Sequence, residues 1–156
     1  MVESAPARTA SQAINREKWT GELLRAGWVM LPNVIIEKQR ELGLDPVDLN
    51  IVLHLATHWW ERETLPHPSV ARMAAAMGMS PRQLSRRLTS LHKRGLVTRQ
   101  VRGTVAAKKT NKYDLRGLIE AAEPHARQMA AERAVAREMK KERRLAAPPS
   151  VNIEGF

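Results

Sequence analysis

The sequence predicts a mainly helical protein with one small β-hairpin. Apolar residues recur at helical spacing through most of the chain, and short segments with Gly or Pro separate the helical stretches. The segment 96–102 alternates apolar and polar residues as a strand does, and 111–115 is predicted to return beside it. With 156 residues, 43% of them hydrophobic, the chain is long enough for one domain with a modest core.

The N-terminal region is predicted to contain little regular structure. Residues 1–15 mix Ser, Ala, Pro and Thr with few large apolar side chains, so we expect a disordered arm. Trp19, Leu23 and Leu24 then suit one short amphipathic helix.

A helix is predicted over 33–42. The preceding segment, 28–31, is expected to be extended because Pro32 disfavours the helical conformation at the residue before it. Gly43 follows the helical stretch and is a suitable C-terminal stop.

The next helix is predicted to begin at Asp45 and to run to about Trp60. Asp45 can cap it, Pro46 suits its first position, and Asp48 is favoured near the N-terminal end of the helix dipole. Most sides of this helix are apolar, which is typical of a central, buried helix. We therefore expect Trp59 and Trp60 to anchor the core.

Two short helices are predicted to follow, with a glycine turn between them. Ser69 is a good N-cap for the first, 70–77, which Gly78 ends. Ser80 opens the second, 80–94, and Gln83 completes a capping box with it. The second helix has a buried stripe at spacings of four and three residues, formed by Leu84, Leu88 and Leu91.

The order of elements predicts a winged helix-turn-helix. Two helices meet at a tight turn, and a hairpin made of 96–102, a loop over 103–110 and 111–115 follows at once. In this arrangement the hairpin is the wing.

A C-terminal helical arm is predicted over 116–144, with Pro124 dividing it into a short helix at 116–122 and a longer one from Glu123. Two interpretations of the arm stay open. It dimerises with a second copy, or it is a solvated arm that binds a partner protein. The dimerisation seam would consist of Met129, Ala130, Ala136 and Met139. Residues 145–156, with two adjacent prolines, are expected to be a disordered tail.

The positive charge of the chain is concentrated in one segment. The formal net charge is +10, from 26 Lys and Arg against 16 Asp and Glu. Between Ser80 and Lys112 there are ten basic residues and no acidic one, so the rest of the chain has a net charge of zero. A local positive field of this kind favours a polyanion, most often nucleic acid. The alternative is a solvated basic face that serves solubility.

Helical geometry favours nucleic acid. With Leu84 at 0° on a wheel of about 100° per residue, Thr89, Arg82, Lys93 and Arg86 fall between about 140° and 200°. The side turned away from the core is therefore cationic and free of carboxylates. A solvated helix face usually mixes both signs, so we expect this helix to contact DNA.

Position along the motif predicts a role for each residue. The N-terminal half of such a helix reaches base edges, whereas the helix end and the wing meet phosphates or the minor groove. Arg87 points sideways, so pairing with an acid is its alternative, and Ser80 combines a cap with a hydroxyl that could donate to phosphate. The base-contact candidates are Arg82, Gln83, Ser85, Arg86 and Thr89. The backbone candidates are Ser80, Arg87, Lys93, Arg99, Arg102, Lys108 and Lys109.

Several other classes of function find little support. The chain has no Cys, which excludes disulfides, thiolate metal sites and Cys nucleophiles. His54 and His58 are four residues apart, but no third ligand has convincing spacing, so we expect packing roles for them and no metal. There is no phosphate-binding Gly loop and no catalytic triad context, and we expect no enzyme activity and no cofactor. No apolar run approaches the ~20 residues of a membrane helix, so we expect a cytoplasmic, nucleoid-associated protein.

One stretch of the chain resembles a known family. It includes Trp59-Trp60, Pro68-Ser69, Ala74 to Ser80, Arg82 to Arg86, Leu91, Gly95 to Arg99 and Asn111 to Leu115. This pattern, over about residues 28–120, resembles the winged-helix domains of small bacterial regulators, and in particular those at the N-terminus of plasmid and phage replication initiators and DnaD-type primosomal proteins. The resemblance implies double-stranded DNA binding, with the helix 80–94 in the major groove.

These observations divide the chain and predict its function. We expect a disordered arm at 1–15, a winged helix-turn-helix DNA-binding domain at 16–115, a C-terminal helical arm at 116–144 and a disordered tail at 145–156. The leading hypothesis is a sequence-selective, double-stranded DNA-binding transcriptional regulator, expected to be a homodimer. The alternatives are a plasmid or phage replication or partition factor, and, in another class, a winged-helix adaptor that binds protein.

Overall fold

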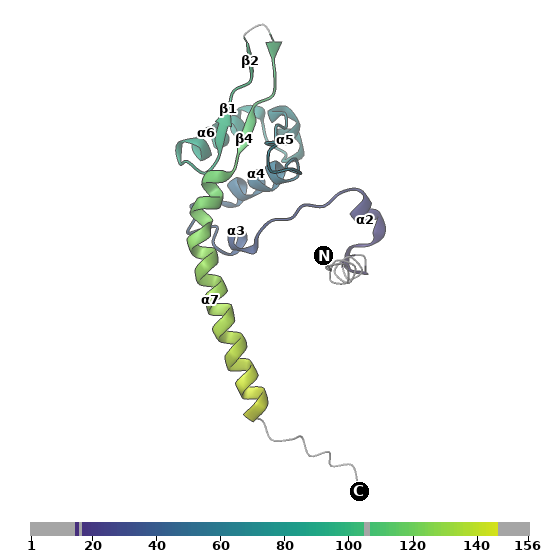
Figure 1. Cartoon of the computed structure of the whole chain (residues 1–156). Coiled ribbons are helices and arrows are strands. Elements are labelled where there is room, and N and C mark those ends of the chain that lie inside the picture. The colour runs from purple at the N-terminus through teal and green to yellow at the C-terminus, as the bar shows by residue number, and fades with distance from the viewer. Residues whose placement is uncertain (1–14, 16, 105–106, 147–156) are drawn as a thin grey trace, which may run out of the picture.

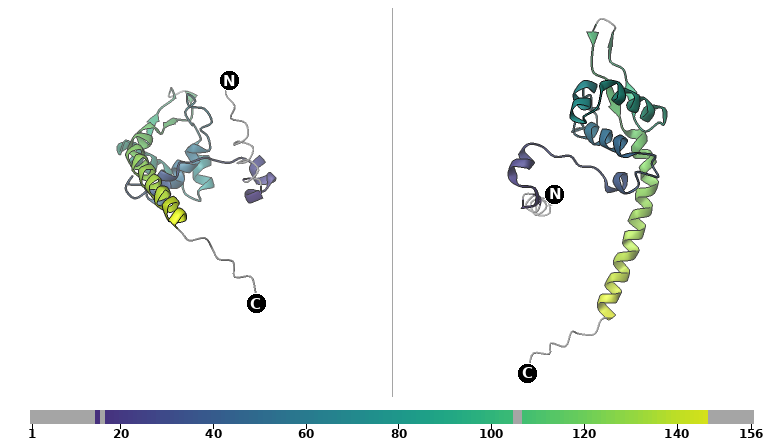
Figure 2. Two further views of the ribbon diagram at one scale, coloured as in Figure 1. Left: turned by 60° about the horizontal axis from the view of Figure 1, so that its bottom comes forward. Right: turned by 180° about the vertical axis from the view of Figure 1, so that it is seen from behind.

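In the computed structural model, which describes residues 15, 17–104 and 107–146, three parts project from a body of short helices (Figure 1). They are the hairpin, the long helix α7 and the N-terminal segment that includes α2, Gly21–Arg25. The predicted arm at 1–15 and tail at 145–156 lie mostly outside the described residues. The views in Figure 2 show the same three projections from other sides.

Helix α3, Asn33–Glu37, is shorter than the predicted helix over 33–42. The chain continues from it in turns as far as Gly43, which has a φ of 69° and so ends the segment as expected. Helix α3 has its buried residues, Val34 and Ile35, on one side, and it packs against α7.

Helix α4, Pro46–Ala56, begins as predicted and ends four residues earlier than expected. A carboxylate oxygen of Asp45 accepts from the backbone N–H of Asp48 at 2.8 Å, which caps the helix. Because the helix ends at Ala56, Trp60 is not carried on its buried face and is 75% exposed. The expected core role is therefore wrong for Trp60, whereas Trp59 packs partly buried against the core.

Helices α5, Val70–Ala76, and α6, Pro81–Lys93, pack against each other across the glycine turn. Gly78 has a φ of 65°, a conformation that favours glycine. The predicted caps are both present. Ser69 accepts from the backbone N–H of Arg72, and Ser80 forms a full capping box with Gln83. The predicted stripe of α6 is buried, with exposed fractions of 2% or less for Leu84, Leu88 and Leu91.

The hairpin lies directly after α6. Strand β1, Thr98–Gln100, pairs antiparallel with β4, Lys112–Asp114, and Arg99 lies opposite Tyr113. Beyond them β2, Gly103–Thr104, pairs with β3, Ala107–Lys108. The expected loop over 103–110 is therefore largely a continuation of the hairpin, because the ladder between the two arms resumes past β1 and β4.

Helix α7, Arg116–Ala146, is a single helix, and the predicted break at Pro124 is wrong. A proline inside a helix removes one hydrogen bond to the preceding turn, and its ring crowds the carbonyl four residues earlier. Leu118 and Ala122 before it and Met129 after it are all buried on the same body, which holds both parts in line. Packing therefore outweighs the local preference of one residue.

The start of α7 lies against the backbone that leaves α6. The N–H of Leu118 donates to the carbonyl of Leu96 at 2.9 Å. A Cβ atom at Gly117 would lie 1.8 Å from the carbonyl oxygen of Gly95, so only glycine allows this approach. The contact fixes the direction in which α7 leaves the body.

The core is one cluster that joins α3, α4, α5, α6, the hairpin and the first half of α7. It is built mostly from aliphatic residues and Met, with Tyr113 as its largest fully buried side chain. The backbone N–H of Tyr113 also donates to the carbonyl of Pro66 at 2.9 Å, so the connector before α5 covers the edge of β4. Within the described ranges, no helix is long and apolar enough to cross a membrane.

Candidate nucleic-acid interface

The side of α6 that faces away from the core is an open, cationic surface. Its residues line one shallow groove, and none of them belongs to the buried cluster. The groove contains every predicted base-contact candidate except Gln83, and it also contains Lys93 and Ser90. Ser90 was not among the candidates, although its wheel position next to Arg86 could have found it. The lining residues are Arg82, Ser85, Arg86, Thr89, Ser90 and Lys93.

Among the described residues, the basic side chains of this groove have no acidic partner. Arg82, Arg86 and Lys93 are exposed, and no carboxylate of the described residues forms an ion pair with any of them. Their charge is therefore uncompensated at short range. A surface with three such cations within four helical turns attracts an extended polyanion.

Ser80 and Gln83 are occupied at the start of α6. The side-chain oxygen of Gln83 lies 2.9 Å from the backbone nitrogen of Ser80 and 3.0 Å from its hydroxyl oxygen, and both groups donate to it. The Ser80 hydroxyl oxygen also accepts from the backbone N–H of Gln83 at 3.2 Å. Bidentate recognition of adenine by Gln83 would break this box, so the two residues are better placed to orient the helix than to contact bases.

Ser85 and Thr89 form the floor of the groove. Both are partly buried, and the Thr89 hydroxyl donates to the carbonyl of Ser85 at 2.9 Å. The threonine hydroxyl keeps its acceptor lone pairs, which can receive a donor from a base edge or from water. These short side chains leave room between Arg82, Arg86 and Lys93.

Arg87 and Arg94 lie on the side of α6 that meets α4. Arg87 pairs with Asp45, the alternative that the sequence left open, and its guanidinium also lies 3.6 Å from a carboxylate oxygen of Asp48. Arg94 contacts the other oxygen of Asp48 at 2.6 Å and donates to the carbonyl of Gly43. Arg87 is thus held by acids, in contrast to its predicted phosphate contact.

The electrostatics of this contact fit a structural role. Partial burial works to raise the pKa of Asp45, but hydrogen bonds from the backbone N–H of Asp48 and from Arg87 hold it below its ordinary value. The same hydrogen bond raises the pKa of Arg87. Both acids of α4 are therefore neutralised on this side, and the negative charge stays away from the open groove.

The hairpin adds further cations in varied environments. Arg99 is partly buried and lies on the same sheet face as Tyr113, its partner on the opposite strand. Burial raises the pKa of Tyr113. Arg102 is partly buried, and Lys109 is exposed. Lys112, on the returning strand opposite Gln100, belongs to the basic segment without having been a candidate. Lys108 lies in β3, but its side chain is outside the described part of the chain.

The one acid of the hairpin is paired with the first residue of α7. Asp114 is 4% exposed, and Arg116 contacts its carboxylate at 2.6 Å. The side-chain hydrogen bond from Arg116 lowers the pKa of Asp114 below its usual value. The backbone N–H of Arg116 donates to the other oxygen at 2.9 Å, so Asp114 also caps the start of α7.

The predicted dimerisation residues have different environments. Met129 is 8% exposed and belongs to the core of its own chain, which leaves little of it for a partner. Ala130, Ala136 and Met139 are exposed on α7, and Met139 is 56% exposed. The homodimer stays a prediction.

The histidine pair takes part in the end of α4. The Nδ1 atom of His58 lies 3.0 Å from the carbonyl oxygen of His54 and 3.0 Å from the hydroxyl oxygen of Thr57. Across the described chain, no group of three His, Asp or Glu side chains is placed to hold a metal ion.

A family model and one solved structure both relate the chain to the N-terminal domain of DnaD. The family model described as the DnaD N-terminal domain matches residues 31–132. The crystal structure of the N-terminal domain of DnaD protein from Geobacillus kaustophilus HTA426 is 24% identical, with a TM-score of 0.52. That match covers 75% of this chain and 96% of the other, and it shows a shared fold. YusO protein from Bacillus subtilis is 14% identical over 93% of this chain and 100% of its own, with a TM-score of 0.39. No curated protein matches the sequence.

Proposed function

This chain belongs to the DnaD N-terminal domain family, and we propose that it binds double-stranded DNA and acts in DNA replication. The observation that carries the proposal is the groove of α6. It presents Arg82, Arg86 and Lys93 to solvent without a carboxylate among them, while the acids nearest to α6 are bound on its other side.

The proposed mode of binding is that of a winged helix-turn-helix. Helices α5 and α6 with the turn at Gly78 supply the motif, and the hairpin of β1 and β4 is the wing. We assign α6 to the major groove, where Arg82 and Arg86 approach base edges. Lys93 and the exposed Lys109 are assigned to phosphates.

Replication is favoured over transcriptional regulation. The sequence led us to expect a regulator first and a replication factor as the alternative, but the family match and the structural match both point to DnaD-type domains. Nothing in these matches supports sequence-specific control of transcription. The role proposed is one of binding, without catalysis, and the adaptor hypothesis is the outcome if the chain binds no DNA.

We also propose a homodimer, with three of the four predicted seam residues at its interface. Of the four predicted seam residues, Ala130, Ala136 and Met139 are exposed and so available to a second copy. Sedimentation equilibrium at micromolar concentration tests it, and a monomer at every concentration would contradict it.

Binding of the full chain to a fluorescent 30-bp duplex over a range of salt concentrations tests the DNA interface. We expect the Arg82→Gln/Arg86→Gln variant to lose at least tenfold in affinity. The matched control, Arg62→Gln/Arg127→Gln, removes the same charge from exposed positions outside the groove. Equal losses in both variants would contradict the interface at α6.

The cellular process needs a separate experiment. Mapping the bound sites across the genome by immunoprecipitation should place them at replication origins or moving forks. Sites concentrated at promoters, with altered transcription of the genes beside them, would contradict the replication role and favour the regulator.

A further inference from the structure

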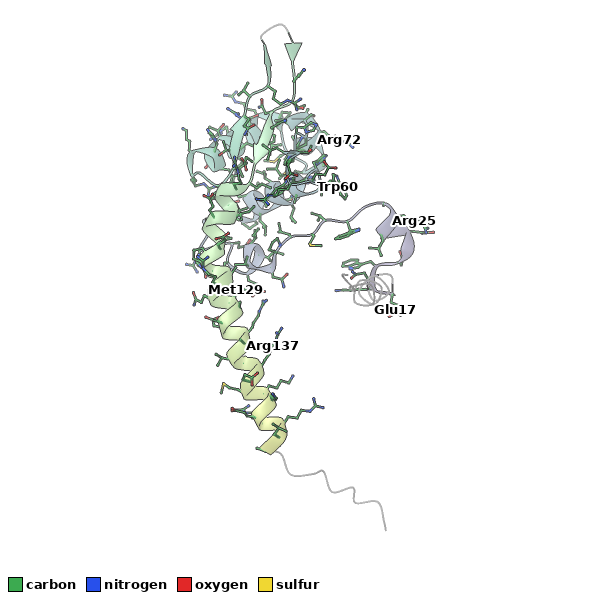
Figure 3. All side chains as sticks on the ribbon, in the orientation of Figure 1. Glu17, Arg25, Trp60, Arg72, Met129 and Arg137 are labelled. Carbon is green, nitrogen blue, oxygen red and sulfur yellow. The ribbon has the colours of Figure 1, made fainter. Side chains whose placement is uncertain are left out.

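Beyond Arg133, which still contacts Glu37 of α3, the second half of α7 leaves the body and carries its side chains into open space. From Met129, the last buried residue of the helix, α7 continues for about 26 Å to Ala146. Every residue from 130 to 146 is exposed. Figure 3 shows the side chains of this part of α7 around Arg137, with no other element packed on them.

The charges on this projecting part are sorted by side. With Arg137 at 0° on a wheel of about 100° per residue, Lys140, Arg144 and Lys141 fall at about −60°, −20° and 40°. The three acids of residues 130–146 lie elsewhere, Glu138 at about 100°, Glu142 at about 140° and Glu132 at about −140°, and one further cation, Arg143, lies outside the arc at about −120°. We call Arg137, Lys140, Lys141 and Arg144 the basic stripe. It covers about 100° of the helix surface and contains no carboxylate.

Within the part of the chain that the structure describes, the basic stripe has no acidic partner. Arg133, one turn earlier at about −40° on the same wheel, does have such a partner. Its guanidinium contacts a carboxylate oxygen of Glu37 in α3 at 2.8 Å. None of the four stripe residues has such a contact with a described carboxylate. The stripe therefore presents four uncompensated cations beyond the reach of the body.

The opposite side of this part of α7 is unsuited to a membrane. Val135 and Met139 lie there at about 160° and −160°, but Glu138 and Glu142 lie beside them. An apolar side that buries little area and brings two carboxylates toward anionic headgroups binds such a surface poorly. The basic stripe is thus the feature of this segment with the clearest binding chemistry.

We propose that the basic stripe of α7 is a second nucleic-acid contact surface, which binds the phosphate backbone independently of α6. Lys and Arg on one arc, with no Asn, Gln, Ser or Thr in the segment 130–146, fit contacts to phosphates. The stripe is about 10 Å long, a length over which duplex DNA carries about six phosphate charges. It lies about 30 Å along α7 from Arg116, so its contacts are separate from those of the α6 groove.

An exchange of charges within the segment tests the stripe. The variant Arg137→Glu/Glu138→Arg/Lys141→Glu/Glu142→Lys has the same composition and net charge as the natural chain, but its basic arc is interrupted. Affinity of the full-length variant for a 60-bp duplex is measured against salt, and circular dichroism checks that α7 is still helical. A second variant, with Gln at all four stripe positions, removes the charge.

We expect the exchange variant to lose about fivefold or more in affinity at low salt. The four-Gln variant should lose at least as much, with its salt slope reduced by about two to four units. The proposal would be overturned if the exchange variant bound the duplex with the affinity and salt slope of the natural chain. It would also be overturned if the stripe bound phosphatidylserine vesicles or an acidic protein while its substitution left DNA affinity unchanged. If Arg82→Gln/Arg86→Gln binds normally while the exchange variant does not, the stripe stands and the interface at α6 fails.

Discussion

The guanidinium of Arg94 lies 2.6 Å from a carboxylate oxygen of Asp48, which joins the end of α6 to the first turn of α4. Asp48 is 3% exposed, and Arg87 approaches its other oxygen from the preceding turns of α6. Two basic residues of the helix that we assign to DNA thus hold it against the central helix, and the remaining cations of α6 face outward.

Removing the charge of Asp48 should destabilise the protein. In Asp48→Asn both arginines lose their buried partner, and we expect the free energy of unfolding to fall by about 2–4 kcal/mol. Urea denaturation followed by circular dichroism measures it. Glu123→Gln is the matched control, because its pair with Arg127 is exposed and contributes about 0.5 kcal/mol or less. Similar losses in both variants would contradict a structural role for the Arg94 pair.

Gly117 should tolerate no side chain. Alanine there brings its Cβ against the backbone carbonyl of Gly95, so α7 must shift and the hydrogen bond from Leu118 to Leu96 weakens. We expect Gly117→Ala to lower the free energy of unfolding by about 2 kcal/mol or more. In the control Gly21→Ala the nearest atom is the end of a flexible arginine at 3.6 Å, so thermal melting should change little. Unchanged stability of Gly117→Ala would show that this approach is looser than described.

The Asp114–Arg116 pair should make stability depend on pH. The folded pKa of Asp114 lies below the ordinary value of about 3.9 for an aspartate side chain, so the pair stabilises the fold above about pH 4 and is lost as the pH falls below that value. The difference in unfolding free energy between the natural chain and Asp114→Asn should therefore shrink between pH 6 and pH 3. Urea midpoints at both values measure it, and a constant difference would contradict the assignment.

Arg86 and Lys109 should differ in what they contribute to DNA binding. Arg86→Gln should cost about 1–3 kcal/mol on a preferred site and relax the sequence preference at one position. Lys109→Gln should weaken binding to all sequences alike and reduce the salt slope by about one unit. Competition with selected and random duplexes distinguishes the two effects. Equal losses on both kinds of duplex in both variants would show that Arg86 does not contact bases.

The sequence predicted correctly those features of the fold that depend on residues close together in the chain. The caps at Asp45, Ser69 and Ser80 are formed by residues three apart or closer, and the turn at Gly78 needs only one glycine. Pro124 and Trp60 were wrongly predicted because packing between distant segments decides their environments. No local sequence pattern indicates that α7 continues through Pro124, or that α4 ends before Trp59 and Trp60.

In the candidate site, too, helical spacing was predictable from the sequence, whereas contacts between distant segments were not. Helical spacing predicted which residues of α6 share an outward face, and Arg82, Arg86 and Lys93 do line one groove. It left the partner of Arg87 open, because Asp45 is 42 residues away and only the packing of α4 on α6 brings it close. Helical spacing alone places the four residues of the basic stripe on one arc, because the sequence already predicts a helix from Glu123 onward.

The junction of α7 with the body has a mechanical consequence. Because its first turn is clamped against the backbone at Gly95 and Leu96, α7 acts as a rigid lever with its pivot beside the last turn of α6. A tilt of about 10° at the pivot would move the free end of α7, about 44 Å along the helix from Gly117, by about 8 Å. A load on the far end of α7 would thus act as torque beside α6, the helix that we assign to DNA.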